Sequence, residues 1–142
     1  MKLLHTSDWH VGKAIRGESR ADEHRAVLAE IVDIARREQV HLVVVAGDLF
    51  DSSSPTAESE EIVYRTLLGL AESGVPVAVI AGNHDNAKRL QAVAPLLELG
   101  RVLLVAEATR PDAGGVIELK VSDGTPVRIA MLPFVSKRGI VR

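Results

Sequence analysis

The chain has 142 residues, 46% of them apolar and 25% charged, with a formal net charge of -2; this length and composition suit one compact domain with its own hydrophobic core. The charge argues against a surface that is basic all round, although it is compatible with a local basic patch. The chain has no cysteine, which excludes disulfide bonds and thiolate zinc sites, and it shows neither a secretory signal nor the ~20-residue apolar run of a membrane span, so we expect a cytoplasmic protein with no membrane partner.

The first half of the chain alternates predicted strands and helices. Residues 3–6 form the first strand, a glycine-containing loop covers residues 11–18, and residues 19–38 carry the apolar stripe of a helix. The β-branched run Leu42–Ala46 is typical of a strand that is buried on both faces of a parallel sheet. We interpret His5, inside the first strand, as a buried and hydrogen-bonded histidine.

The second helix is expected to begin near Pro55, with Ser54 as its N-cap. A third buried strand follows at Val77–Ile80. The resulting β-α-β-α-β order predicts right-handed crossovers and a parallel sheet.

The rest of the chain predicts shorter elements. They are a helix at 87–97 and strands at 102–105, 116–121 and 127–132. The last two strands flank Asp123-Gly124, which is a hairpin signal. We therefore expect an α/β fold with a mostly parallel first sheet, helices outside it, and a partial second sheet. The basic stretch at 136–142 has no periodic pattern.

Three polar motifs follow the three predicted parallel strands. In open α/β sheets, ligands bind at the carboxyl ends of the strands, so these motifs are expected to meet at one edge of the sheet. Each motif alone is more simply explained as a capped turn, but all three in order are hard to explain in that way. The motifs are SDWH (Ser7–His10), GDLFD (Gly47–Asp51) and GNHD (Gly82–Asp85).

The side chains in these motifs are oxygen and nitrogen ligands for divalent cations. In extended backbone, Asp8 and His10 point the same way and can chelate one ion, with Trp9 turned to the other side. The carboxylate of Asp48 has two oxygens and can bridge two cations, and Asn83 offers a carbonyl oxygen. The first two motifs and Asn83 thus predict a metal site.

Two divalent ions at such a site can bind a phosphate and lower the pKa of a shared water, which becomes the nucleophile. His84 would add a proton donor or a charge aimed at the phosphate oxygens. Asp51 and Asp85 are interpreted as partners that orient these groups. The combination predicts an enzyme that cleaves phosphate esters.

Basic residues follow the first motif closely. Lys13, Arg16 and Arg20 are candidates for contacts with DNA phosphates beside the metals. An ordinary solvated loop explains them equally well.

The three motifs resemble those of the calcineurin-like metallophosphoesterases. The wording around them, LLHTSDWHVGK, VVVAGDLFD and VIAGNHD, is similar to the SbcD nuclease subunits, bacterial relatives of the eukaryotic MRE nuclease, as is the later IAMLPF. The resemblance implies an α/β/β/α sandwich and manganese-dependent cleavage of DNA phosphodiester bonds, with Mg²⁺ as the alternative ion. It further implies exonuclease and endonuclease activity in DNA repair and recombination, together with an SMC-like ATPase partner, SbcC.

Carried over position by position, the resemblance also implies roles for single residues. Asp8 and His10 would hold the first metal, Asp48 would bridge both metals, and Asn83 would hold the second. His84 would be the catalytic histidine beside the phosphate.

One departure from the family pattern concerns histidine. The family completes its metal site with further histidines later in the domain, whereas none of the five histidines of this chain lies beyond His84. We therefore expect residues 1–142 to be the N-terminal part of a longer metallophosphoesterase domain, weak or inactive alone, and homodimeric as the full-length protein.

Two alternatives stay open at this point. The motifs alone permit a phosphomonoesterase or a cyclic-nucleotide phosphodiesterase on the same scaffold. The missing histidines instead favour a catalytically silent fragment or a dimerisation module.

Overall fold

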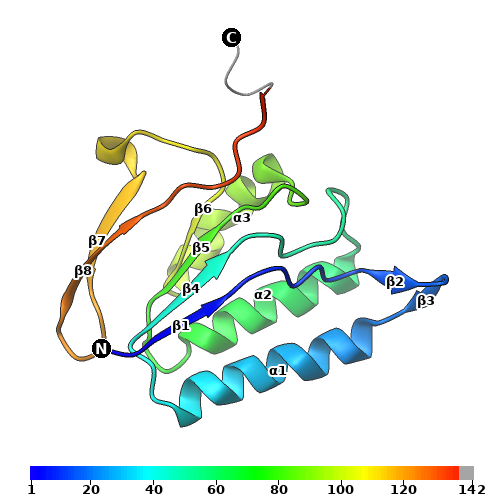
Figure 1. Ribbon diagram of the computed structural model, residues 1–142, viewed down its shortest axis with the longest axis horizontal. Coiled ribbons are helices and arrows are strands. Elements are labelled where there is room, and N and C mark those ends of the chain that lie inside the picture. Colours follow the sequence, from blue (N-terminus) through cyan, green and yellow to red (C-terminus); the bar gives the residue numbers. More distant parts are fainter. Residues whose placement is uncertain (138–142) are drawn as a thin grey trace.

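A four-stranded parallel sheet forms the centre of the computed structural model, which describes residues 1–137 (Figure 1). Its strands, in spatial order, are β1 (Leu3–Thr6), β4 (Leu42–Ala46), β5 (Val77–Ile80) and β6 (Val102–Val105). The connecting helices are α1 (Ala21–Arg37), α2 (Ala57–Ala71) and α3 (Ala87–Leu99). The expected α/β fold with a mostly parallel sheet is confirmed.

The strand order explains how the layers are arranged. The strands follow one another in a single direction across the sheet, so right-handed crossovers place their helices on the same face. Figure 1 shows α1 and α2 side by side, with α3 behind β5 and β6. The strand residues that face the helices are at most 1% exposed and form the centre of the core; they are Val43, Val45, Val77, Val79 and Val102.

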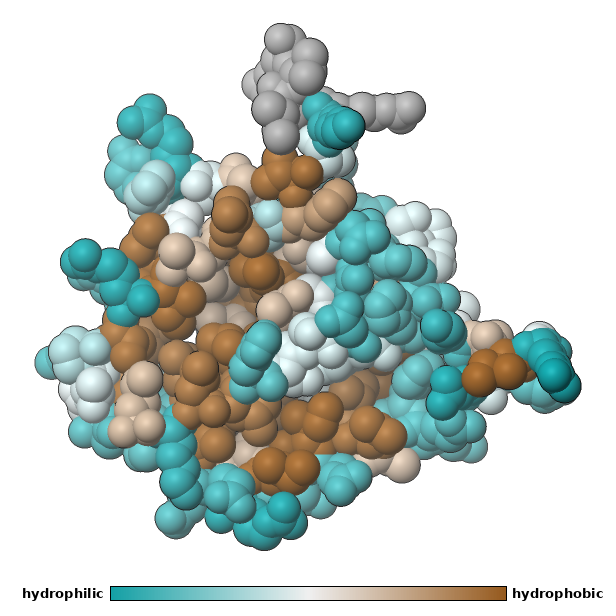
Figure 2. Space-filling model, viewed as in Figure 1, coloured by the Kyte–Doolittle hydropathy of each residue, from teal (hydrophilic) through white to brown (hydrophobic). Residues whose placement is uncertain are grey.

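The opposite face of the sheet carries a smaller apolar group. Leu42, Ala78, Val121 and Met131 are buried there but lie outside the main core cluster. Figure 2 shows apolar surface on this side of the molecule. The interpretation of His5 as buried is wrong: β1 is an edge strand that pairs only with β4, and His5 is exposed.

The helix starts differ from the sequence predictions. The second helix is capped by Thr56 and not by Ser54, because the Thr56 side chain accepts a hydrogen bond from the Ser59 amide at 3.1 Å. The first helix begins at Ala21, two residues later than expected. The reason is that the residues before it pair in a hairpin.

Two antiparallel hairpins complete the fold. The first, β2 (Ala14–Ile15) with β3 (Glu18–Ser19), projects from the body of the protein where a loop was expected. Its turn residues Arg16 and Gly17 both have positive φ, which is typical of a tight hairpin turn. The second hairpin, formed by the expected pair of strands around Asp123-Gly124, consists of β7 (Val116–Lys120) and β8 (Pro126–Ala130), preceded by the short η1 (Pro111–Ala113). This is the small second sheet that was expected.

Part of the sequence carries no structural description. Of the basic stretch at 136–142, residues 138–142 lie outside the described residues. Among the described residues, no helix is both long enough and apolar enough to cross a membrane.

Tyr64 of α2 lies beneath the loop that follows β4. Its ring meets that of Phe50 edge to face, with 6.1 Å between the ring centroids. The Tyr64 hydroxyl is buried and has no hydrogen-bond partner among residues 1–137. Burial, with a smaller contribution from the charge of Glu60, raises the pKa of Tyr64 to about 12.

We expect Tyr64→Phe to lessen the loss of stability at alkaline pH. The unfolded chain releases the phenolic proton at about pH 10, so the stability contributed by neutral Tyr64 is present below that pH. It is lost as the pH rises towards the folded-state pKa of about 12. Phenylalanine has no such proton, and it also removes an unpaired buried hydroxyl. Thermal melts of both proteins at neutral and alkaline pH check this, and parallel declines of the two melting temperatures would contradict it.

Candidate metal centre at the carboxyl edge of the sheet

The loops that carry the first two motifs are paired with each other beyond the ends of β1 and β4. Backbone amides of one loop donate to carbonyls of the other, each at 3.0 Å: Asp8 N to Gly47 O, His10 N to Asp48 O, and Val11 N to Leu49 O. These bonds continue the parallel pairing of the two strands. The side chains of both motifs are therefore held at one edge of the sheet by the backbone.

Three residues in these loops adopt left-handed backbone conformations. The φ angles are 56° at Asp8, 47° at His10 and 52° at Asp48. Such conformations are uncommon outside glycine, although aspartate and histidine adopt them more readily than most residues, and they cluster at functional sites. The expectation that Asp8 and His10 lie in extended backbone is wrong, because each leaves the strand geometry in order to pair with the neighbouring loop.

Two glycines let the second and third motifs approach each other. A Cβ atom on Gly82 would overlap the Oδ1 atom and the amide nitrogen of Asp48, and a Cβ on Gly47 would lie 2.7 Å from the Gly82 Cα. Asp48 is thus packed directly against the Gly82 backbone. Sequence reasoning missed this role of Gly82, and its only signal was the glycine that opens the GNHD motif.

Three side chains converge into one group. Ligand atoms of His10, Asp48 and His84 all lie within 4.8 Å of one another. His10 Nε2 is 3.6 Å from Asp48 Oδ2, and the rings of His10 and His84 are 4.8 Å apart in an edge-on arrangement. Imidazole nitrogen with carboxylate oxygen is a donor set that fits a divalent transition-type cation. The chain therefore presents a group that can hold a metal.

The other two predicted ligands lie less close to this group. Asp8 Oδ1 is 3.8 Å from His10 Nε2, but the Asp8 side chain is 67% exposed and its Oδ2 accepts a hydrogen bond from Ser7 Oγ. Asn83 is exposed, and its side chain makes no hydrogen bond within the part of the chain that the structure describes. Asp8 is thus at the margin of the group, and a role for Asn83 stays a prediction.

Asp51 contacts both histidines. Its carboxylate Oδ1 lies 3.2 Å from His10 Nδ1, and its backbone carbonyl accepts a hydrogen bond from His84 Nδ1 at 2.9 Å. Both partners are acceptors, so each Nδ1 carries a proton and each Nε2 is left for another contact. The hydrogen bond to the Asp51 carbonyl, helped by the charges of Asp48, Asp51 and Asp85, raises the pKa of His84.

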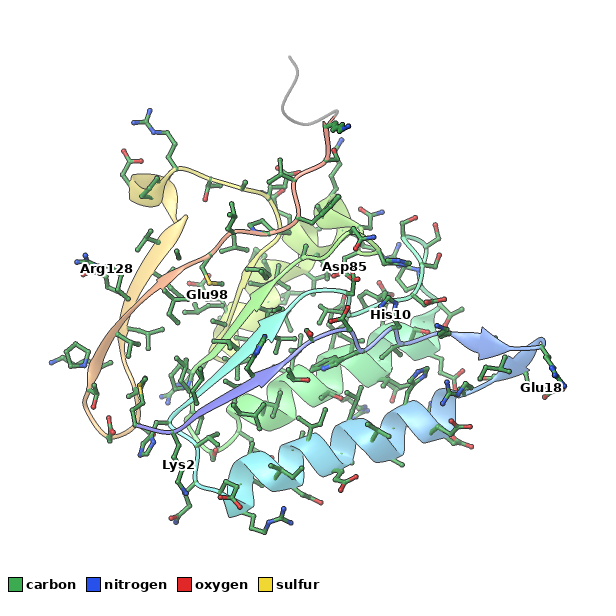
Figure 3. The ribbon with its side chains drawn as sticks, viewed as in Figure 1. Lys2, His10, Glu18, Asp85, Glu98 and Arg128 are labelled. Atoms are coloured by element: carbon green, nitrogen blue, oxygen red, sulfur yellow. The ribbon has the colours of Figure 1, made fainter. Side chains whose placement is uncertain are left out.

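The carboxylate of Asp85 ties the third motif to the second. It accepts hydrogen bonds from the amides of Gly82 at 2.8 Å, Phe50 at 3.0 Å and Leu49 at 3.3 Å. In addition, Asp48 Oδ1 accepts from the His84 amide at 3.0 Å, which leaves Asp48 Oδ2 facing His10. Figure 3 shows His10 and Asp85 together at the ends of the central strands. The two motifs are therefore cross-linked through backbone amides.

The basic residues near the first motif differ in their partners. Arg20 forms an ion pair with Glu23, with its Nη2 and Nε atoms 2.6 and 2.8 Å from Glu23 Oε2. Arg16 lies at the exposed turn of the β2–β3 hairpin, and Lys13 precedes that hairpin and is also exposed. Neither Lys13 nor Arg16 forms an ion pair with another described residue.

The parallel sheet and the metal-binding group at its carboxyl edge define a phosphoesterase domain. The sequence profile of the calcineurin-like phosphoesterases matches residues 1–123, and the chain belongs to this family of metal-dependent phosphoesterases.

Curated relatives narrow the comparison. The chain is 44% identical over 110 residues to SbcD of the nuclease SbcCD from Bacillus subtilis, covering 77% of this chain and 28% of the relative. It is 34% identical over 142 residues to the protein of the same name in Escherichia coli K12, covering 99% and 34%. It is 33% identical over 137 residues to "DNA double-strand break repair protein Mre11" of Sulfurisphaera tokodaii, covering 96% and 34%. The chain thus spans about a third or less of the length of these relatives.

Proposed function

We propose that this protein is a metal-dependent DNA phosphodiesterase, with exonuclease and endonuclease activity in DNA repair and recombination. The observation that carries the proposal is the convergence of His10, Asp48 and His84 within 4.8 Å, in a chain whose relatives are named as nuclease and break-repair proteins. A small-molecule phosphomonoesterase would share the metal group. The similarity to nuclease subunits between the motifs favours DNA as the substrate.

The metal ligands are proposed from the donor set. His10, Asp48 and Asp8 would hold the first cation, and Asp48 with Asn83 would hold the second. We propose Mn²⁺, with Mg²⁺ as the alternative, since imidazole with carboxylate oxygen suits Mn²⁺ better. When bound, such cations supply positive charge that polarises the phosphate ester and lowers the pKa of a nearby water.

The protein's own side chains act on position and proton supply. His84 donates its Nδ1 proton to the Asp51 carbonyl, so its Nε2 atom is directed to another partner, which we propose is a phosphate oxygen. Asp51 holds His10 by its carboxylate, so a single residue orients one proposed ligand and one proposed catalytic group. Asp85 keeps the loops of both motifs together.

The DNA path would continue from this edge onto the β2–β3 hairpin. Lys13 and Arg16 are exposed cations without an ion-pair partner among the described residues, so they are free to contact phosphates. Arg20 would have to exchange its pairing with Glu23 for a phosphate.

The larger assembly belongs to the same proposal. We propose that residues 1–142 are the N-terminal part of a longer nuclease subunit that works with an SMC-like ATPase, SbcC, in the bacterial cytoplasm. The lengths and names of the relatives support this. A homodimer is proposed through the outer faces of α2 and α3, where Leu68, Leu96 and Leu99 are 42%, 67% and 85% exposed.

Turnover of two substrates by the complete protein tests the function. With Mn²⁺ present, we expect cleavage of a DNA hairpin and little hydrolysis of p-nitrophenyl phosphate. Hydrolysis of the small monoester alone would contradict the nuclease proposal. Calorimetric titration of residues 1–142 with Mn²⁺ addresses the remaining alternative, because a folded chain that takes up no metal would be a silent module when isolated.

A further inference from the structure

The segment that follows β8 lies beside the candidate metal centre. Phe134 N donates a hydrogen bond to the Ala81 carbonyl at 2.9 Å, and Met131 N donates to the Gly115 carbonyl at 2.7 Å. Ala81 directly follows β5 and is followed in turn by Gly82, Asn83 and His84. Figure 1 shows this red segment passing the carboxyl ends of the central strands. The backbone of Phe134 is thus fixed next to the GNHD motif.

Burial alternates along this segment. Met131 and Pro133 are buried, whereas Leu132 and Phe134 are 70% and 57% exposed. In an extended segment, alternate side chains point to opposite sides, so the buried pair holds the segment in place while Phe134 is presented outwards. The position of Phe134 is therefore set by its neighbours and not by burial of its own ring.

Phe134 is the accessible aromatic residue of this chain. The sequence has only four aromatic residues besides histidine, and all four lie within the described residues. Trp9 and Phe50 are 8% and 2% exposed, and Tyr64 is half-buried. In a protein so poor in aromatic side chains, an exposed ring next to the metal centre calls for a partner with an aromatic or flat apolar face.

Cations lie on both sides of the ring and of the metal centre. Lys13 and Arg16 follow β1 at one end of the sheet order, while Phe134 pairs with Ala81 beyond β5, and the exposed Lys137 is three residues further along. Single-stranded nucleic acid is bound in this way, by cations that follow its phosphates and by aromatic rings on which its bases stack. A peptide or a second copy of the chain would match the ring but not the cations.

We propose that Phe134 stacks on a nucleobase of the DNA strand next to the bond that is cleaved, and so favours nucleotide substrates over small phosphate esters. This inference rests on the proposed function and adds the contact that recognises the base. Stacking on a ring is tolerant of sequence, because every base has a flat face. The contact therefore selects for nucleic acid without selecting a particular sequence.

The test is a comparison of variants and substrates in the complete protein with Mn²⁺. Phe134→Leu, which keeps an apolar side chain but removes the ring, should lower kcat/KM on a DNA hairpin by on the order of tenfold. Phe134→Tyr should restore activity to near the wild-type level. Leu132→Ala, on the same exposed side of the same segment, is the matched control and should change kcat/KM by less than about twofold. Equal losses in Phe134→Leu and Leu132→Ala would overturn the stacking role.

A substrate without bases around the cleaved bond separates this inference from the proposed function. On a hairpin with abasic sites flanking that bond, Phe134→Leu should cause no further loss relative to wild type. An equal loss on intact and abasic DNA would overturn the inference while the nuclease function stands. Failure of the wild-type protein to cleave any DNA would instead overturn the proposed function.

Discussion

Asp48→Asn is expected to reduce DNA cleavage by the complete protein by on the order of 10³-fold, since charge stabilisation at a phosphoryl group by bound cations is worth several kcal/mol. Asp48 is only 9% exposed, and its Oδ2 atom faces His10 Nε2. Asparagine can still accept the hydrogen bond from the His84 amide through Oδ1. The substitution therefore removes the negative charge but keeps the main contact that positions the side chain.

Cleavage, metal uptake and DNA binding should separate in this variant. We expect calorimetry to show weakened Mn²⁺ binding, while DNA affinity stays close to that of the wild type because Lys13 and Arg16 are untouched. Asp33→Asn removes an exposed carboxylate from α1 and is the matched control, which should leave all three quantities unchanged. Near-normal cleavage by Asp48→Asn would show that the proposed bridging role is wrong.

Gly82→Ala is expected to destabilise the protein and to abolish metal binding together. The added Cβ would overlap Asp48 at its Oδ1 and amide nitrogen atoms, so the loops of the second and third motifs would have to separate. Overpacking costs about 1–3 kcal/mol, and more where backbone must move. The separation would also break the hydrogen bonds that Asp85 makes to Leu49 and Phe50.

Thermal melts and Mn²⁺ titration of the same samples check this prediction. Gly69→Ala is the matched control, because a Cβ on this helical glycine would lie 3.7 Å from a Val32 methyl carbon, an ordinary contact. Alanine in a helix is favoured over glycine by about 1 kcal/mol, so the control should melt at the same temperature as wild type or higher. A Gly82→Ala protein that melts and binds Mn²⁺ like the wild type would mean that the two motifs are not packed as described.

The sheet could be predicted from sequence because its strands carry strong patterns. Leu42–Ala46 and Val77–Ile80 are short apolar runs between helical stripes, and a parallel sheet is the arrangement that buries such strands on both faces. The same pattern does not reveal which strand lies at the edge of the sheet, since that depends on strand order. His5 was misplaced for this reason. The β2–β3 hairpin was missed because two-residue strands are too short to show any period.

The site was predicted less completely than the sheet. The motifs identified the residues that meet at the edge, but the reasoning that joined Asp8 to His10 assumed extended backbone. Their left-handed conformations are imposed by pairing with residues 47–49, which no local pattern contains. The contact from His84 to the Asp51 carbonyl was also invisible, because it is made by the main chain and not by a side chain.

The amide bonds between the loops after β1 and β4 have a consequence for how ions would exchange. Asp8, His10 and Val11 have their amides engaged by carbonyls of the neighbouring loop without any ion in place. Loading would then require no ordering of the chain, so affinity would depend on the number and type of donor atoms and very little on conformational entropy. One cation could replace another on a nearly rigid template, and the choice of ion would fall to its concentration in the cell.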